Sequence, residues 1–188
     1  MAVTIGKKAE SDFTNPLGLL NDCHRRIEYF LSLLVTVARR ARGRKLHSDE
    51  REALEAALRY FKQAAPKHTL DEEESLFPRM RASGDVLAQS AVAVLNALHR
   101  DHTIADETHK EVDALARRWL DEGQLSEGEA HRLEGMLEDL AEIYRRHIAI
   151  EDNEIFPLAG KILSQPELEA MGHEMAARRG VDPSRRTL

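Results

Sequence analysis

Apolar residues recur at every third or fourth position along most of the chain, and this spacing predicts amphipathic helices rather than strands. Asn15 and Pro16 open the first helix, because Asn caps a helix well and Pro suits the first helical position. Ser126 with Glu129 forms a capping-box pattern, which marks the start of a later helix. We predict four long helices, at about residues 15–43, 48–78, 85–121 and 126–157.

Three prolines indicate where the helices bend or end. Pro66 lies inside the second helix and should kink it, because proline lacks an N–H and its ring clashes with the preceding turn. Pro78 and Pro157 are predicted to end the second and fourth helices. A short fifth helix should follow from Ser164 to about Gly180.

Two segments of eleven residues share one pattern. Residues 68–78 read HTLDEEESLFP, and residues 147–157 read HIAIEDNEIFP. Each has a histidine, an acid four residues later, and then an apolar residue, Phe and Pro. A leucine also lies four residues before His24 and before His102, which precede the two motif histidines by 44 and 45 residues. We interpret the chain as a duplicated helical hairpin.

The histidines of each hairpin should lie level with each other. At about 1.5 Å per residue, His24 and His68 are both roughly 30 Å from the turn between them, and the second hairpin repeats this geometry. The glutamate four residues after each motif histidine lies on the same helix face. An all-α, antiparallel four-helix bundle would therefore gather six side chains in one layer of its core: His24, His68, Glu72, His102, His147 and Glu151.

Such a layer needs a compensating positive charge, because buried carboxylates repel each other and are costly to remove from water. Two metal ions would supply it, and imidazole with carboxylate donors suits iron, zinc or manganese. In a symmetric arrangement each ion takes two histidines and the glutamates bridge, although the sequence does not fix the pairing. The ordinary alternative is a set of core or surface histidines beside solvated acids. The matched duplication argues against that alternative.

The ordered set of six side chains, with its repeated Phe-Pro endings, resembles the hemerythrin-like, or HHE cation-binding, proteins. The resemblance implies an antiparallel four-helix bundle around two non-haem iron ions with a solvent-derived bridge. It also implies dioxygen, nitric oxide or peroxide as the small ligand. We therefore predict an N-terminal lead at residues 1–14, a hemerythrin-like bundle at 15–160, and a C-terminal helix and tail at 161–188.

Two positions depart from the oxygen-carrying hemerythrins. Asp106 stands where those proteins have a second histidine after their third ligand histidine. Glu151 comes one place early in a motif that usually reads H-x-x-x-x-D, although Asp152 follows it. The resemblance then implies a more stable ferric state, which argues against reversible oxygen carriage. Iron-centre repair proteins resemble the ligand pattern more closely, but nothing before Asn15 resembles their cysteine-containing segment.

Several functions are compatible with such a centre. The first is the binding or sensing of dioxygen, nitric oxide or related oxidants at an open iron position. The second is an enzyme that decomposes peroxide or reduces nitric oxide, and the third is an iron donor for the repair of iron centres. A metal with a purely structural role is a fourth. Tyr144, three residues before His147, suits core packing first, and a hydrogen bond to a bound ligand or the supply of an electron second.

Charge and composition exclude some classes of protein. The 188 residues carry a net charge of −6, whereas a nucleic-acid-binding surface is normally basic. Cys23 is the only cysteine, so an internal disulfide is impossible. The first residues lack the apolar run of a signal peptide, and no stretch approaches 18 apolar residues. We expect a cytoplasmic protein that binds neither nucleic acid nor membranes, in which Arg178 and Arg179 form a solvated helix end.

Overall fold

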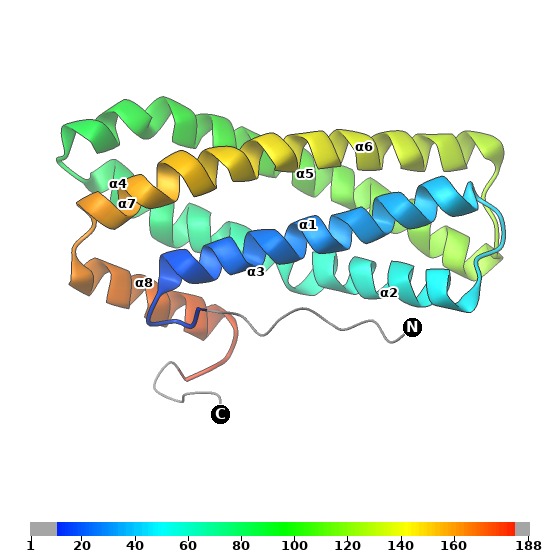
Figure 1. Cartoon of the computed structure of the whole chain (residues 1–188), viewed down its shortest axis with the longest axis horizontal. Coiled ribbons are helices and arrows are strands. Elements are labelled where there is room, and N and C mark those ends of the chain that lie inside the picture. The colour runs from blue at the N-terminus through cyan, green and yellow to red at the C-terminus, as the bar shows by residue number, and fades with distance from the viewer. Residues whose placement is uncertain (1–10, 183–188) are drawn as a thin grey trace. The chain divides into compact units, whose positions relative to one another are not determined.

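The computed structural model describes residues 11–182 (Figure 1). Within this range it contains α-helices, two short π-helical segments and turns, and no strand. The predicted all-α fold is therefore confirmed. Most of the predicted N-terminal lead and the last six residues of the predicted tail lie outside the described residues.

The helices begin and end close to their predicted positions. Glu129 accepts hydrogen bonds from the backbone N–H and the hydroxyl of Ser126, so the predicted capping box is formed. The elements in chain order are α1 (Pro16–Ala41), α2 (Ser48–Gln63), α3 (Ala65–Leu70), η1 (Asp71–Leu76), α4 (Phe77–Ala82), α5 (Val86–Glu122), α6 (Glu127–Ile150), η2 (Glu151–Ile155), α7 (Phe156–Ile162) and α8 (Gln165–Arg178).

The prediction for Pro66 is confirmed, and those for the two later prolines are wrong. The helix is interrupted at Ala64, between α2 and α3, two residues before Pro66. Pro78 and Pro157, in contrast, do not end their helices. Each lies in the first turn of a further helix, α4 or α7, so the second and fourth helical runs extend to residues 82 and 162.

The π-helical segments η1 and η2 explain how the helices pass these prolines. The N–H of Phe77 donates to the carbonyl of Glu72, and the N–H of Phe156 donates to the carbonyl of Glu151. Each bond spans five residues instead of the four of an α-helix. The wider turn accommodates the proline ring, which would otherwise clash with the carbonyl four residues earlier. The repeated motif therefore produces one local structure twice.

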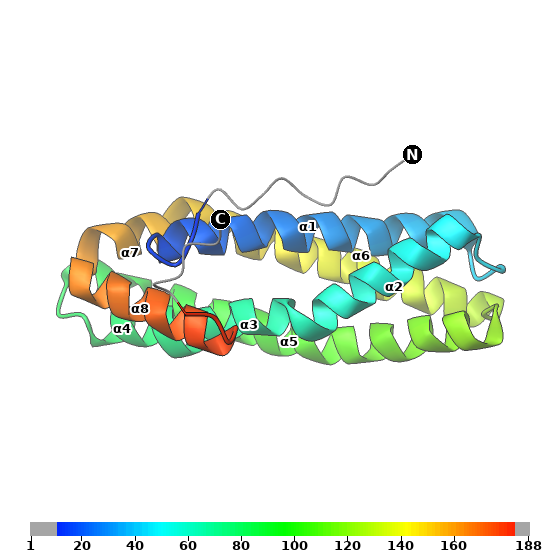
Figure 2. The ribbon, with the colours of Figure 1, turned by 90° about the horizontal axis from the view of Figure 1, so that it is seen from below.

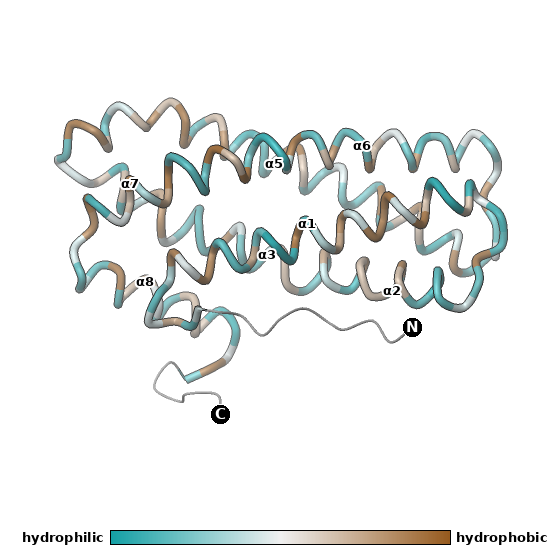
Figure 3. The backbone as a smooth tube through the Cα atoms, viewed as in Figure 1, coloured by the Kyte–Doolittle hydropathy of each residue, from teal (hydrophilic) through white to brown (hydrophobic). Residues whose placement is uncertain are grey.

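The chain forms two compact units, each built from parts of several helices. Within the described residues, unit 1 consists of residues 11–26, 65–99 and 148–182, and unit 2 consists of residues 27–64 and 100–147. Figure 3 shows apolar and polar stretches alternating along the helices of both units, as expected for amphipathic helices. No helix in residues 11–182 is long and apolar enough to cross a lipid bilayer.

Unit 1 has one apolar core to which η1, η2, α7 and α8 all contribute. Leu76, Phe77 and Met80 are fully buried there, next to Phe156 and Met175. Helix α8 packs on η1 (Figure 2). It is therefore part of the core of this unit.

Unit 2 contains the hairpin turns between α1 and α2 and between α5 and α6, and the two turns are bonded to each other. The indole N–H of Trp119 donates to the carbonyl of Arg44 at 2.8 Å, and the N–H of Leu125 donates to the carbonyl of Gly43 at 2.8 Å. Trp119 is 1% exposed, so its apolar ring is buried while its N–H is satisfied. These contacts hold the two hairpins of unit 2 together.

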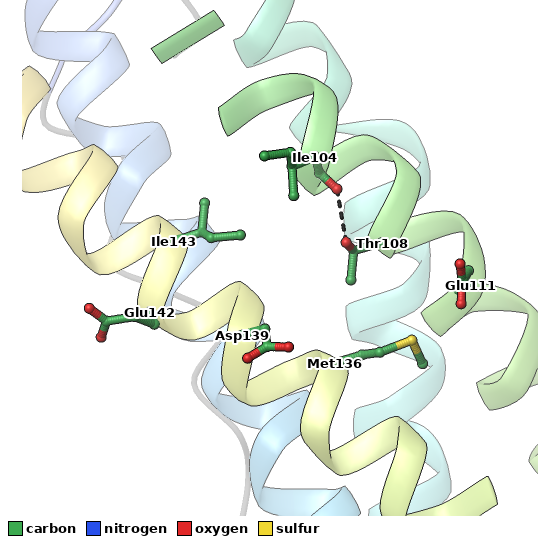
Figure 4. Close-up of a pocket in the computed structure, with 7 residues that line it drawn as sticks. All are labelled: Ile104, Thr108, Glu111, Met136, Asp139, Glu142 and Ile143. Atoms are coloured by element: carbon green, nitrogen blue, oxygen red, sulfur yellow. Dashed lines mark hydrogen bonds between the residues drawn. The ribbon is translucent and has the colours of Figure 1, made fainter. Parts of the chain in front are cut away.

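A shallow groove of about 430 Å³ also lies in unit 2, between α5 and α6 (Figure 4). Its lining combines three apolar side chains with a threonine and three acids. None of the six predicted metal ligands lines it, so it is separate from the candidate site. The lining residues are Ile104, Thr108, Glu111, Met136, Asp139, Glu142 and Ile143.

Candidate metal centre

Four of the six predicted side chains meet in unit 1. His24 comes from α1, His68 from α3, Glu72 from η1 and Glu151 from η2. One potential ligand atom from each lies within 4.8 Å of the other three. All four side chains are buried, and the two glutamates have no exposed area. Unit 1 therefore holds two imidazoles and two carboxylates at a single point.

The distances within this cluster are short. Nε2 of His68 lies 3.2 Å from Oε1 of Glu72, one helical turn later. Nε2 of His24 lies 3.2 Å from Oε2 of Glu151 and 3.7 Å from Oε1 of Glu72. Glu72 is the second residue of η1 and Glu151 is the first residue of η2, so the same kind of local structure presents both carboxylates. Imidazole nitrogen and carboxylate oxygen in this proportion are suitable donors for iron.

The ring of His24 is fixed from its other side. Its Nδ1 donates to Oδ1 of Asp152 at 2.6 Å, and Phe156 stacks on the ring with the centroids 5.2 Å apart. A carboxylate bound to the second nitrogen of a histidine is a common support for metal ligation, because it fixes the tautomer and the orientation of the ring. Asp152 thus leaves Nε2 of His24 facing Glu72 and Glu151.

The protonation of His24 indicates that the cluster favours a positive charge. Burial by itself lowers the pKa of this imidazole, but hydrogen bonds to Asp152, Glu151 and Glu72 outweigh burial and raise the pKa to about 12. A metal ion bound at Nε2 would supply the same charge in place of the proton. The residues present therefore fit the metal that the resemblance implies.

Helix α8 holds the segment that carries Glu72. Asp71 is fully buried and accepts hydrogen bonds from Arg178 at 2.9 Å and from Arg179 at 2.6 Å. Arg178 also donates to the hydroxyl of Ser75 at 2.8 Å. Burial raises the pKa of Asp71 despite the two guanidinium groups, and the hydrogen bonds from Arg178 and Arg179 fix the position of η1.

The arginine contacts correct one prediction. Arg178 and Arg179 were expected to form a solvated helix end, but both bind the buried Asp71. A partial indication that Asp71 is buried was present in the sequence. It lies three residues after the predicted ligand His68, and therefore on the same side of the helix. Nothing in the spacing showed which basic residues would meet it, since they lie more than 100 positions away.

The other two predicted ligands lie in unit 2. His102 of α5 and His147 of α6 have their ring centroids 4.6 Å apart, and His147 is buried. Nδ1 of His147 lies 3.6 Å from Oδ2 of Asp101. Asp106, which stands at the position of the additional histidine of the oxygen-carrying hemerythrins, is largely exposed and forms an ion pair with Lys110 at 2.6 Å. That position agrees with a solvent-facing acid.

The helical fold and the buried cluster of histidines and glutamates define a helical protein with a candidate cation-binding site. The sequence profile of the Hemerythrin HHE cation binding domain matches residues 15–159, and the chain belongs to the hemerythrin family. The chain is also similar to an uncharacterized protein of Haemophilus influenzae. The two are 26% identical over 169 residues, which cover 90% of this chain and 92% of the relative. The resemblance inferred from the repeated motif is thus confirmed.

Proposed function

We propose that the protein binds two iron ions and takes a small oxidant, such as dioxygen, nitric oxide or peroxide, at an open coordination position. The observation that carries this proposal is the buried cluster of unit 1, whose ligand atoms lie within 4.8 Å of one another. The histidines of the two hairpins and the two glutamates would hold the ions. The proposed ligands are His24, His68, Glu72, His102, His147 and Glu151.

The second half of this ligand set is supported by local geometry. His102 and His147 face each other in unit 2 at 4.6 Å between ring centroids. Helix α6 continues directly into η2, and Glu151 follows His147 by four residues, as Glu72 follows His68. Because the first copy of the motif brings its histidine and glutamate within 3.2 Å, we propose the same role for the second copy.

Bound iron would supply a Lewis acid and a one-electron redox centre. The protein residues prepare the site for it. Asp152 fixes the ring of His24, and the stacked Phe156 covers one face of that ring. The two glutamates neutralise cationic charge in a buried region from which water is largely excluded.

The donor set also favours one kind of reaction over another. A site with two anionic carboxylates and only four neutral imidazoles stabilises ferrous iron less than a site richer in histidine, and therefore favours the ferric state more. We propose that dioxygen oxidises this centre irreversibly, as in a sensor or an enzyme, rather than binding to it reversibly. An enzyme that reduces peroxide or nitric oxide is the second candidate, and the hydrogen-bonded pair of His109 and Tyr144 in unit 2 favours it.

Optical spectroscopy of the iron-loaded protein tests the proposal. The reduced protein, prepared without oxygen, is exposed to dioxygen and then returned to vacuum. We expect a ferric absorption band that persists under vacuum and a new band when nitric oxide is added to a fresh reduced sample. A band that disappears on removal of oxygen would indicate a carrier. The absence of any spectral response to both gases would contradict the proposed function.

A further inference from the structure

All three tyrosines of the chain lie in one row of aromatic rings in unit 2. The row runs through Tyr29, Phe30, Tyr60, Phe61 and Tyr144. Successive ring centroids are 5.1, 4.3, 5.4 and 6.5 Å apart. Tyrosine and phenylalanine therefore alternate along the row, and each phenylalanine lies between two tyrosines.

The two ends of the row differ in their surroundings. Tyr29 is 37% exposed, so a reductant in solution can reach its ring. Tyr144 is partly buried on α6, three residues before the proposed ligand His147, and therefore on the same side of the helix. The row thus connects the surface of unit 2 with the neighbourhood of a proposed metal ligand.

The inner tyrosine has a base beside it. Nε2 of His109 lies 3.1 Å from the hydroxyl of Tyr144, and Phe61 stacks on the His109 ring at 4.3 Å. Burial lowers the pKa of His109 to about 4, so its ring is neutral at pH 7. In the tautomer with its proton on Nδ1, Nε2 can accept the phenolic proton. Tyrosine is oxidised readily only when its proton can leave together with the electron.

Packing alone does not account for this arrangement. The buried core of unit 2 consists mostly of leucine and alanine, whereas Tyr29, Phe30 and Tyr60 are only partly buried. Phe30 and Tyr60 nevertheless stack with an interplanar angle of 20°. Such stacking keeps the neighbouring aromatic rings close together. At this partly exposed position the burial of apolar surface contributes little to the stability of the fold.

We propose that this aromatic row carries single electrons between the surface at Tyr29 and Tyr144 beside the metal-binding residues. It would supply the electrons that a centre reacting with peroxide or dioxygen requires, and in this respect it rests on the proposed function. Short steps between neighbouring rings replace one long transfer through aliphatic side chains.

The transfer balances as follows in electrons and protons. When the metal-binding residues hold a one-electron oxidant, such as ferric iron or peroxide, Tyr144 would give it one electron and give its phenolic proton to Nε2 of His109. The products are a neutral tyrosyl radical and an imidazolium. Tyr60 then reduces the Tyr144 radical and releases its own proton to water, while the proton on His109 returns to Tyr144. Tyr29 in turn reduces the Tyr60 radical, which regains a proton from water, and Tyr29 releases its own proton to water. A one-electron reductant in solution finally restores Tyr29, which regains its proton from water.

A first experiment tests the path without metal. A flash-generated ruthenium(III) tris-bipyridine oxidant removes an electron at the surface of the metal-free protein, and frozen samples are examined by electron paramagnetic resonance. We expect a radical on Tyr144, which Tyr144→Phe abolishes while a radical on the exposed Tyr29 remains. Phe30→Leu should leave the radical on Tyr29 and reduce the Tyr144 signal at least about tenfold, whereas Phe30→Tyr should restore it. Circular dichroism checks that the three variants fold.

A second experiment uses the iron-loaded protein with peroxide and a spin trap. We expect trap adducts on Tyr29, found by mass spectrometry, and their loss in both Tyr144→Phe and Phe30→Leu. A Tyr144 radical of wild-type yield in Phe30→Leu, or no Tyr144 radical in the metal-free wild type, would overturn the proposal. The first experiment needs no iron. A protein that fails to bind iron can therefore be distinguished from one whose aromatic row fails to carry electrons.

Discussion

The two units of the molecule bury different kinds of side chain. Among the described residues, the buried polar and charged side chains of unit 1 are Asp22, His24, His68, Asp71, Glu72, Ser75 and Glu151, whereas unit 2 buries only His147. Buried charge is unfavourable unless a partner compensates it. Unit 2 is therefore stabilised mainly by apolar packing, while unit 1 carries an electrostatic cost that a bound cation would offset.

The two copies of the motif differ in a similar way. Both present a buried glutamate in the first turn of a π-helical segment. The first copy has Asp71, bound by Arg178 of α8 and by the next residue, Arg179, at the position where the second copy has Ile150. The second copy has Asp152, which binds His24. The repeated sequence thus fixes the ligand geometry, and its supports are specific to each copy.

The largest effect is expected from removing a bridging glutamate. Glu72→Ala or Glu151→Ala should lower metal affinity more than about 100-fold, because loss of a ligand exceeds the effect of losing its supporting residue. The metal-free variant should remain folded, since one of two buried, mutually repelling carboxylates is gone. Isothermal titration calorimetry measures the affinity. Glu154→Ala, an exposed acid in the same π-helical segment, should leave it unchanged.

A large effect on stability is expected at Asp71. Asp71→Asn leaves Arg178 and Arg179 without their carboxylate and should lower the free energy of unfolding by about 3 kcal/mol. Urea denaturation of the metal-free protein measures this change. Glu74→Gln removes a largely exposed partner of the same Arg178 and should change stability by no more than about 0.5 kcal/mol. Equal effects of the two substitutions would show that α8 does not hold η1 through Asp71.

A smaller effect on metal binding is expected at Asp152. Asp152→Asn keeps the size of the side chain but weakens the bond that orients His24, and should lower metal affinity about 10- to 100-fold. The absorption spectrum of a cobalt-substituted sample should shift as the ring reorients. Glu154→Gln provides the matched control. Unchanged affinity in Asp152→Asn would mean that the stacked Phe156 is enough to fix the ring.

The smallest effect concerns a surface ion pair of unit 2. The hydrogen bond from Arg44 holds the pKa of Glu50 at about 2, below its usual 4.5. Because the folded-state pKa is lowered, this pair stabilises the fold above pH 4.5, and the contribution decreases below pH 4.5 and is lost as the pH falls through 2. Arg44→Gln should therefore lower the midpoint of thermal unfolding slightly at pH 7 and leave it unchanged at about pH 1. Thermal unfolding at both pH values tests this contrast with the buried Asp71.

The sequence predicted the helices, and it predicted that His24, His68, Glu72 and Glu151 lie close together, largely from local spacing. Capping residues and the period of apolar positions define helix limits, and a four-residue interval puts His68 and Glu72 on one face. The continuation of the helices past Pro78 and Pro157 was not predicted. A π-turn that absorbs a proline has no single-residue signal, although its repetition at the two Phe-Pro endings was visible.

The residues that hold the site in position were harder to predict from the sequence. In the sequence Asp152 was notable only as the acid that follows Glu151, and its bond to His24 joins residues 128 positions apart. The contacts of Asp71 with α8 and the aromatic row likewise join distant positions. Long-range pairs of this kind depend on how helices pack. A periodic pattern shows which face of a helix is buried, but it does not show which other helix packs against that face.

Anomalous X-ray scattering from a crystal of the iron-loaded protein tests the central claim most directly. We predict two peaks at the iron absorption edge. One peak should lie among His24, His68, Glu72 and Glu151, and the other beside His102 and His147. Peaks located only at surface acids, or no peak although the crystal was grown with excess iron, would contradict the account.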